Sequence, residues 1–144
     1  MMAAQDARAV PITPCLWFNG QAEDAAAFYI SLFPGSAITQ VSRYGEGQPF
    51  PAGTALMVEF SLGGRGYQAL NGGPQYTHSE AFSLSISAPD QAAADALWAA
   101  LTSNGGSEGR CGWCKDRFGI SWQVVPAGLG ALLGDADRAR AGRA

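Results

Sequence analysis

The chain has 144 residues, of which 47% are hydrophobic and only 15% charged, and its formal net charge is -3 at neutral pH. This length suffices for the core of one compact domain, whereas two full domains would be cramped. The composition excludes the basic surface that neutralises a nucleic-acid backbone. No apolar run approaches the roughly 20 residues that cross a bilayer. We therefore expect a single domain without a nucleic-acid or membrane partner.

The ends of the chain and its cysteines indicate a cytoplasmic protein. The segment MMAAQDARAV carries Asp6 where a signal peptide would place its apolar stretch. Three cysteines are an odd number and too few for a disulfide scaffold, which agrees with a reducing compartment. We expect residues 1–9 and 135–144 to be flexible ends.

The first half of the chain predicts one strand, one helix and three further strands. Residues 12–18 are apolar and end at Asn19-Gly20, which indicates a strand closed by a turn. Residues 22–33 have apolar side chains at helical spacing, acidic residues in the first turn and a Pro-Gly stop. The expected buried helix face consists of Ala25, Phe28, Tyr29 and Leu32. The three further strands are expected at residues 37–44, 54–62 and 65–71.

The second half repeats this order from residue 81. A strand is expected at 81–87, a helix at 92–103, a weakly indicated strand near 105–110, and strands at 109–116 and 120–126. In the helices, Tyr29 corresponds to Trp98, and in the last strands of each half, Gln68 corresponds to Gln123. A chance match of short patterns is the alternative, but the agreement of two separate segments argues against it.

Strand alternation gives each predicted sheet one apolar face and one partly polar face. The final strand places Trp122 on the apolar face and Gln123 on the other. The polar face of the fifth strand is formed by Ser83, Ser85 and Ser87, opposite Phe82, Leu84 and Ile86. In a curved sheet, the polar face could line a concave pocket.

The segment Cys111-Gly-Trp-Cys114 raises the question of a redox or metal site. Residues three apart on a strand point to opposite faces, so these thiols could not hold one metal without a local distortion. Zinc would need two more ligands, and the chain offers only Cys15 and His78. A thioredoxin-like motif needs a following helix, whereas this segment continues as a turn and a strand. We predict two ordinary strand cysteines, with a reversible disulfide as the alternative.

Three segments carry a resemblance to a known family: ITPCLWFNGQAEDAAAFYISLFPGS, ALNGGP and CGWCKDRFGISWQVVP. With them the chain resembles the vicinal oxygen chelate (glyoxalase/bleomycin-resistance) superfamily over residues 11–127, and within it the PhnB-like, 3-demethylubiquinone-9 3-methyltransferase-like group. The resemblance implies an α+β fold of two βαβββ modules, residues 11–71 and 81–126, within one domain. The two modules would form a curved mixed sheet with the helices outside, in which each module contributes half of a cup. Proteins of this kind usually assemble as homodimers.

Metal-dependent members of that superfamily carry His on the first and fifth strands and Glu on the fourth and eighth. Here Gln68 and Gln123 stand at the two Glu positions, and the His positions fall near Cys15 or Pro14 and near Ser83. Amides and hydroxyls are weak ligands, so we expect no tightly bound metal, with a weakly held divalent ion as the alternative.

No segment has the glycine-rich strand-to-helix turn that would hold a nucleotide-like cofactor. Gly63-Gly64 lies between two predicted strands and fits a hairpin better. We therefore expect no cofactor, and we do not expect the methyltransferase activity in the group's label.

The candidate ligand-binding residues are Gln123, Gln68, Asn71, Glu59, Trp17, Trp113 and Ser83. Each has a structural alternative. The two glutamines could bind a polar ligand group or bridge the modules as a satisfied pair, and Asn71 could lie at a pocket rim or cap its strand. Glu59 could be a buried general base with a raised pKa or a solvated residue.

Other side chains are weaker candidates. Trp17, Trp113 and Phe18 could wall an aromatic pocket or belong to the core. His78 reads as an exposed loop residue. The charges of the final hairpin, Lys115, Asp116 and Arg117, could contact an anionic ligand or be solvated turn residues.

These residues predict a protein that binds a small polar or aromatic molecule in a cup without a tightly bound metal, and they do not select a reaction. A metal-dependent lyase, dioxygenase or resistance-type enzyme is one alternative. A homodimeric ligand-sequestering protein, with an aromatic groove between chains, is another.

Overall fold

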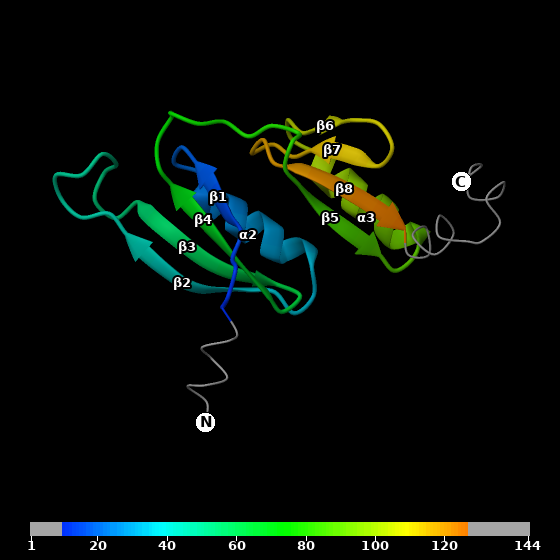
Figure 1. Cartoon of the computed structure of the whole chain (residues 1–144), viewed down its shortest axis with the longest axis horizontal. Coiled ribbons are helices and arrows are strands. Elements are labelled where there is room, and N and C mark those ends of the chain that lie inside the picture. Colours follow the sequence, from blue (N-terminus) through cyan, green and yellow to red (C-terminus); the bar gives the residue numbers. More distant parts are fainter. Residues whose placement is uncertain (1–9, 127–144) are drawn as a thin grey trace, which may run out of the picture. The chain divides into compact units, whose positions relative to one another are not determined.

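A computed structural model describes residues 10–126, so the two predicted flexible ends lie outside the described residues. The chain divides into two compact units, the first ending at Tyr76 and the second starting at Thr77 (Figure 1). Within residues 10–126, each unit, called a module below, contains one helix and one four-stranded sheet with parallel and antiparallel pairs. The predicted α+β class and the βαβββ repeat are confirmed.

The first module consists of β1 (Cys15–Phe18), α2 (Ala22–Leu32), β2 (Ala37–Arg43), β3 (Ala55–Leu62) and β4 (Arg65–Asn71). Its strand order is β1-β4-β3-β2, and only the β1–β4 pair is parallel. The first strand begins three residues later than predicted. Pro14 lacks the N–H that a strand residue donates to its neighbour, although its carbonyl still accepts from Gln68 N at 2.9 Å.

Helix α2 covers one face of the first sheet. Its Ala25 and Tyr29 are fully buried as predicted, whereas Phe28 and Leu32 are only half-buried. Ala22 and Ala26 occupy the buried stripe instead, because their small side chains let the helix approach the sheet closely. The sheet side of this core consists of Leu16, Phe18, Val58, Phe60 and Ala69.

The second module consists of β5 (Ser83–Ala88), α3 (Gln91–Thr102), β6 (Ser107–Glu108), β7 (Trp113–Lys115) and β8 (Ser121–Pro126). Its strand order, β5-β8-β7-β6, repeats that of the first module, and again the first and last strands pair in parallel. The weakly indicated sixth strand is present but has only two residues. Phe82, predicted on the apolar face, lies before β5 and is 49% exposed.

The predicted strand over residues 109–116 is wrong in its first half. Cys111 and Gly112 have φ angles of 55° and 82°, and Trp113 N donates to Arg110 O at 2.9 Å, so these residues form a tight turn. A Cβ on Gly112 would lie 2.8 Å from Val124 O, which requires glycine there. Cys111 is therefore an exposed turn residue, and only Cys114 is a buried strand residue; both thiols are free.

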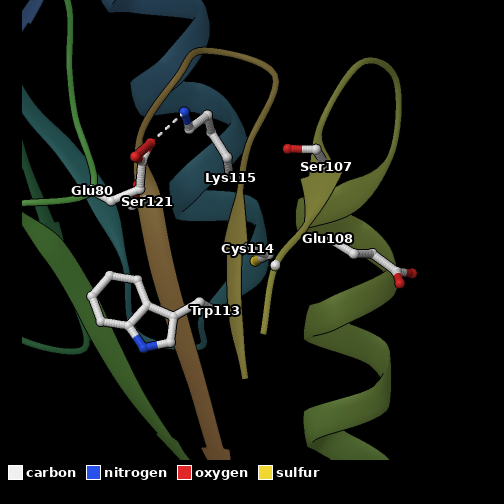
Figure 2. Close-up of a pocket in the computed structure, with 8 residues that line it drawn as sticks. Glu80, Ser107, Glu108, Trp113, Cys114, Lys115 and Ser121 are labelled. Atoms are coloured by element: carbon white, nitrogen blue, oxygen red, sulfur yellow. Dashed lines mark ion pairs between the residues drawn. The ribbon is translucent and has the colours of Figure 1, made fainter. Parts of the chain in front are cut away.

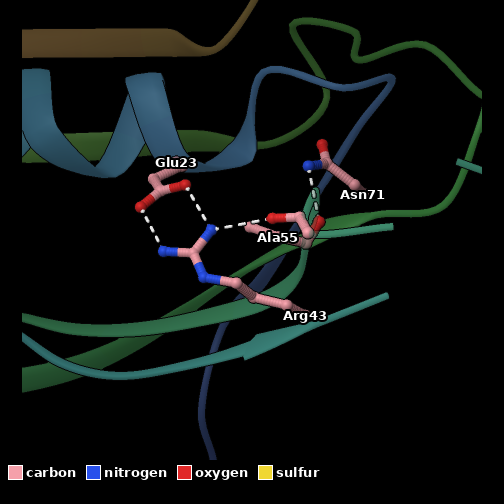
Figure 3. A network of polar contacts seen from close by, with 5 residues as sticks. Glu23, Arg43, Ala55 and Asn71 are labelled. Carbon is pink, nitrogen blue, oxygen red and sulfur yellow. Dashed lines mark hydrogen bonds and ion pairs between the residues drawn. The ribbon is translucent and has the colours of Figure 1, made fainter. Parts of the chain in front are cut away.

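The side chain of Asn71, at the end of β4, holds the start of α2. Its Oδ1 accepts hydrogen bonds from Gly20 N at 2.9 Å and Ala22 N at 3.0 Å. Its Nδ2 donates to Ala55 O at 2.8 Å (Figure 3). Gln21, the residue before the helix, makes no side-chain cap. Asn71 thus satisfies the buried first N–H of the helix, Ala22 N, and an N–H of the turn before it.

An ion pair joins the same helix to the edge strand β2. Arg43 Nη1 and Nη2 donate to the Glu23 carboxylate at 3.0 and 2.9 Å, and Nη1 also donates to Gly53 O (Figure 3). The hydrogen bond from Arg43 lowers the pKa of Glu23. Because both side chains are largely exposed, this pair adds little stability.

The second module starts its helix with a different residue. Its strand pairing places Pro126 opposite Ala88, where the first module places Asn71 opposite Phe18. Proline has no side-chain acceptor. Instead, Asp90 caps α3 locally, its Oδ1 accepting from Ala93 N at 2.8 Å.

Asp116 organises the β7–β8 hairpin. Its Oδ1 accepts from Phe118 N at 2.8 Å and Ile120 N at 3.1 Å, and its Oδ2 accepts from Trp122 Nε1 at 2.8 Å. The residue is only 2% exposed, so the alternative of a solvated turn charge is wrong for Asp116. Its carboxylate is used within the hairpin and does not face a ligand.

Asn71→Ala should lower the free energy of unfolding by about 2–3 kcal/mol, because it leaves Gly20 N, Ala22 N and Ala55 O without their partner. Urea unfolding followed by circular dichroism measures the loss. Asn19→Ala, an exposed asparagine in the neighbouring turn, is the control and should change stability by less than about 0.5 kcal/mol. Equal stability of the two variants would contradict the role given to Asn71.

Asp116→Asn should also destabilise the protein, by about 1–3 kcal/mol, because an amide nitrogen cannot accept the bond from Trp122 Nε1. Chemical unfolding gives the loss, and near-ultraviolet circular dichroism reports the environment of the tryptophan. Asp95→Asn, on the exposed side of α3, is the matched control. An unchanged near-ultraviolet spectrum and stability in Asp116→Asn would refute this assignment.

The two thiols of the CGWC segment should react differently with iodoacetamide. Burial, reinforced by the carboxylates of Asp116 and Glu108, raises the pKa of Cys114 to about 11. The reactive thiolate of Cys114 is therefore scarce at pH 8 and increases only as the pH approaches that value. Peptide mass mapping should find Cys111 alkylated well before Cys114 at pH 8. Equal labelling at that pH would show that Cys114 is not buried as described.

Candidate functional site

In the first module, the sheet face opposite α2 carries a polar row across all four strands. Strand pairing aligns Cys15, Gln68, Glu59 and Gln40 on β1, β4, β3 and β2. Gln68 and Glu59 are half-buried, and burial raises the pKa of the Cys15 thiol. This open face brings together two of the predicted ligand-binding residues, Gln68 and Glu59.

The open face of the second module has the corresponding row. Here pairing aligns Ser85, Gln123 and Trp113 on β5, β8 and β7. Ser85, rather than the predicted Ser83, therefore lies opposite Gln123 as Cys15 lies opposite Gln68. Ser83 instead accepts a hydrogen bond from Gln123 Nε2 at 2.9 Å, which holds the glutamine side chain across the face.

The remaining candidates do not lie freely on an open face. Asn71 is 1% exposed and uses both side-chain polar atoms within the first module, where they bind the start of α2 and the backbone of β3. Phe18 is in the core. Trp17 packs on the loop after β4, where its Nε1 donates to Gly73 O at 2.8 Å and its ring meets Tyr76 edge-on. A Cβ on Gly72 would lie 2.2 Å from the Trp17 ring, so glycine is needed beneath it.

The open faces carry few of the side chains that commonly bind metals. No three His, Cys, Asp or Glu side chains among residues 10–126 are grouped as a metal would require. The raised pKa keeps the Cys15 thiol protonated near neutral pH, whereas metals bind the thiolate. The row around Gln123 contains an amide, a hydroxyl and an indole, which bind ligands through hydrogen bonds and stacking.

Gly63 and Gly64, with φ angles of 57° and 89°, form the tight turn between β3 and β4, as predicted from their position. They precede a strand rather than a helix. They therefore do not form the phosphate-binding turn of a nucleotide-like cofactor site.

A cavity of about 200 Å³ lies in the second module beside β7 (Figure 2). It is lined by Glu80, Ser107, Glu108, Gly109, Trp113, Cys114, Lys115 and Ser121. Of these, the sequence had singled out Trp113 and Lys115 as ligand candidates. Ser121 could have been found, because it alternates with Gln123 on the same strand face, whereas Glu80 lies in a loop whose path no local pattern predicts.

The other charged candidates are engaged locally. Lys115 Nζ forms an ion pair with Glu80 at 2.7 Å, and Arg117 lies over the Phe118 ring at 4.7 Å. His78 is half-buried in the loop before β5. No helix within residues 10–126 has the length and apolar composition to span a bilayer.

Comparison with known proteins identifies the family. Residues 10–125 match the family described as 3-demethylubiquinone-9 3-methyltransferase. A putative 3-demethylubiquinone-9 3-methyltransferase, PhnB protein, from Bacillus cereus is 31% identical with a TM-score of 0.76, covering 82% of this chain and 100% of its own. Protein PA1353 from Pseudomonas aeruginosa is 25% identical with a TM-score of 0.67, covering 82% and 98%.

A glyoxalase/bleomycin resistance protein from Albidiferax ferrireducens is 17% identical, with a TM-score of 0.50 over 77% of this chain and 94% of its own, which supports the shared fold alone. No functionally curated protein shows significant similarity to the chain. The family match covers most of the chain and agrees with the paired βαβββ modules. The chain therefore belongs to the PhnB-like, 3-demethylubiquinone-9 3-methyltransferase family, with the glyoxalase/bleomycin-resistance fold.

Proposed function

We propose that this chain is a metal-independent protein that binds a small polar or aromatic molecule on the open sheet faces. The observation that carries the proposal is the held amide of Gln123, half-buried on β8 with its Nε2 bound to Ser83 Oγ at 2.9 Å. That bond leaves the amide oxygen Oε1 to accept from a ligand. Trp113, its strand partner on β7, offers an aromatic surface beside it.

The chemistry of the equivalent row in the first module supports binding without a metal. Gln68 lies between Cys15 and Glu59, so a single carboxylate stands beside a neutral amide and a protonated thiol. Such groups bind a ligand through directed hydrogen bonds, whereas a tight divalent site needs several charged or imidazole donors. The methyltransferase activity in the family's description does not enter the proposal, because Gly63-Gly64 joins two strands and does not lead from a strand into a helix.

We include a homodimer in this proposal. Large apolar side chains are exposed in both modules: Ile12 is 93% exposed in the first and Phe82 49% in the second. Covering such side chains with a second copy of the chain would remove apolar surface from water.

Native mass spectrometry of metal-stripped protein, before and after addition of manganese, zinc and nickel, tests the metal and the assembly together. We expect a dimer that retains no stoichiometric ion. Ligand-observed NMR with a panel of small uncharged amides, alcohols and phenols tests binding. We expect at least one compound to bind the wild type and Gln91→Ala, whose glutamine lies on α3, but not Gln123→Ala.

Two results would overturn this proposal. One tightly held ion per chain, lost in Gln123→Ala, would point to metal-dependent lyase or dioxygenase chemistry instead. A panel in which no compound distinguishes Gln123→Ala from Gln91→Ala would remove Gln123 from ligand binding.

A further inference from the structure

The cavity beside β7 has a polar wall built from three neighbouring strands. Strand pairing aligns Ser121 on β8, Lys115 on β7 and Ser107 on β6. In Figure 2 the side chains of Lys115 and Glu80 point toward each other, whereas Glu108 points toward α3. One ammonium, two hydroxyl-bearing serines and two glutamates, Glu80 and Glu108, thus line the same small hollow.

The hydroxyl of Ser121 is the unusual member of this wall. Ser121 is 2% exposed, and within residues 10–126 no protein group forms a hydrogen bond with its Oγ. Nearly all buried side-chain polar atoms in folded proteins are hydrogen-bonded. A buried hydroxyl without a protein partner, lining a cavity, is therefore a donor that a bound molecule could satisfy.

The ammonium next to this hydroxyl is held by a replaceable partner. Lys115 Nζ pairs with Glu80 Oε1 at 2.7 Å, but the Glu80 side chain is 69% exposed and belongs to a loop. Exposed ion pairs of this kind contribute little free energy, so another anion can exchange with Glu80 at small cost. The space beside Lys115 Nζ is already large enough for a carboxylate, that of Glu80.

We infer that this cavity is a binding subsite for a small carboxylate with a flat apolar body. The ligand carboxylate takes the place of Glu80 on Lys115 and accepts a hydrogen bond from Ser121 Oγ, while the apolar body lies against Trp113. The ammonium and the two hydroxyl groups supply donors for an anion. Of the two carboxylates in the lining, the ligand replaces that of Glu80, and that of Glu108 accepts from Trp98 Nε1 of α3 at 3.3 Å. The inference rests on the proposed function, since Ser121 lies on the same open face of β8 as Gln123.

Titration of the full chain with sodium benzoate tests the subsite, with benzamide as a neutral probe of the same shape. Isothermal titration calorimetry gives the affinity, and amide chemical shifts in ¹H–¹⁵N NMR locate the contact. We expect benzoate to bind better than benzamide and to shift the amides of residues 113–121.

Four variants assign the charges of the subsite. Lys115→Gln should weaken benzoate binding by about tenfold or more, since it removes a charge-assisted hydrogen bond. Ser121→Ala should weaken it by a smaller factor. Glu80→Gln should strengthen it, because the competing carboxylate is gone. Arg110→Gln, which removes an exposed cation in the β6–β7 turn, is the control and should leave the affinity unchanged.

The inference is overturned if benzoate fails to bind, if benzamide binds equally well, or if Lys115→Gln leaves the affinity unchanged. Weaker benzoate binding in Glu80→Gln, an exposed substitution with little effect on folding, would also overturn it. If benzoate does not bind but an uncharged compound binds in a Gln123-dependent way, only the carboxylate subsite is refuted. Loss of both kinds of binding would remove the proposed function as well.

Discussion

The first module depends on one buried amide, the side chain of Asn71. Its three hydrogen bonds join the turn after β1, the first residue of α2 and the backbone of β3. Its backbone carbonyl also accepts from Tyr44 Oη at 2.6 Å, which ties in the segment after β2. Because α2 has no side-chain cap of its own, the position of its first turn relative to β1 and β3 depends on this residue.

The two modules reach the same architecture through different local chemistry. Where the first module uses Asn71, the second places Pro126 and transfers the capping of the helix to Asp90. Where the first closes its last hairpin with Gly63-Gly64, the second uses the Asp116 carboxylate, which binds backbone N–H groups and Trp122. Repetition of the fold therefore constrains strand order and pairing, while individual side chains have diverged.

Patterns of alternation and helical spacing were enough to predict the α+β class, the repeated element order and the location of Gln68 and Gln123 on open faces. They failed where one turn or one tertiary hydrogen bond decides the structure. Cys111 lies in a turn because both Cys111 and Gly112 have positive φ angles. In the sequence, only Gly112 indicates such a turn. Asn71 resembles a rim residue in the sequence because its hydrogen-bond partners lie at least 16 residues away along the chain. The partners of Asp116 lie within six residues, but the burial of its carboxylate depends on how the hairpin packs.

The open faces differ in the groups that they present, although the strand frameworks match. The row in the first module centres on Gln68 beside the Glu59 carboxylate. In the second module, Ser121 lies two residues before Gln123 on β8, and Lys115 is its strand partner on β7. A carboxylate would be repelled by Glu59 in the first module and attracted by the ammonium of Lys115 in the second. Strand pairing fixes where the open-face residues lie in each module but not which residues they are, so the same framework presents different charges in the two modules.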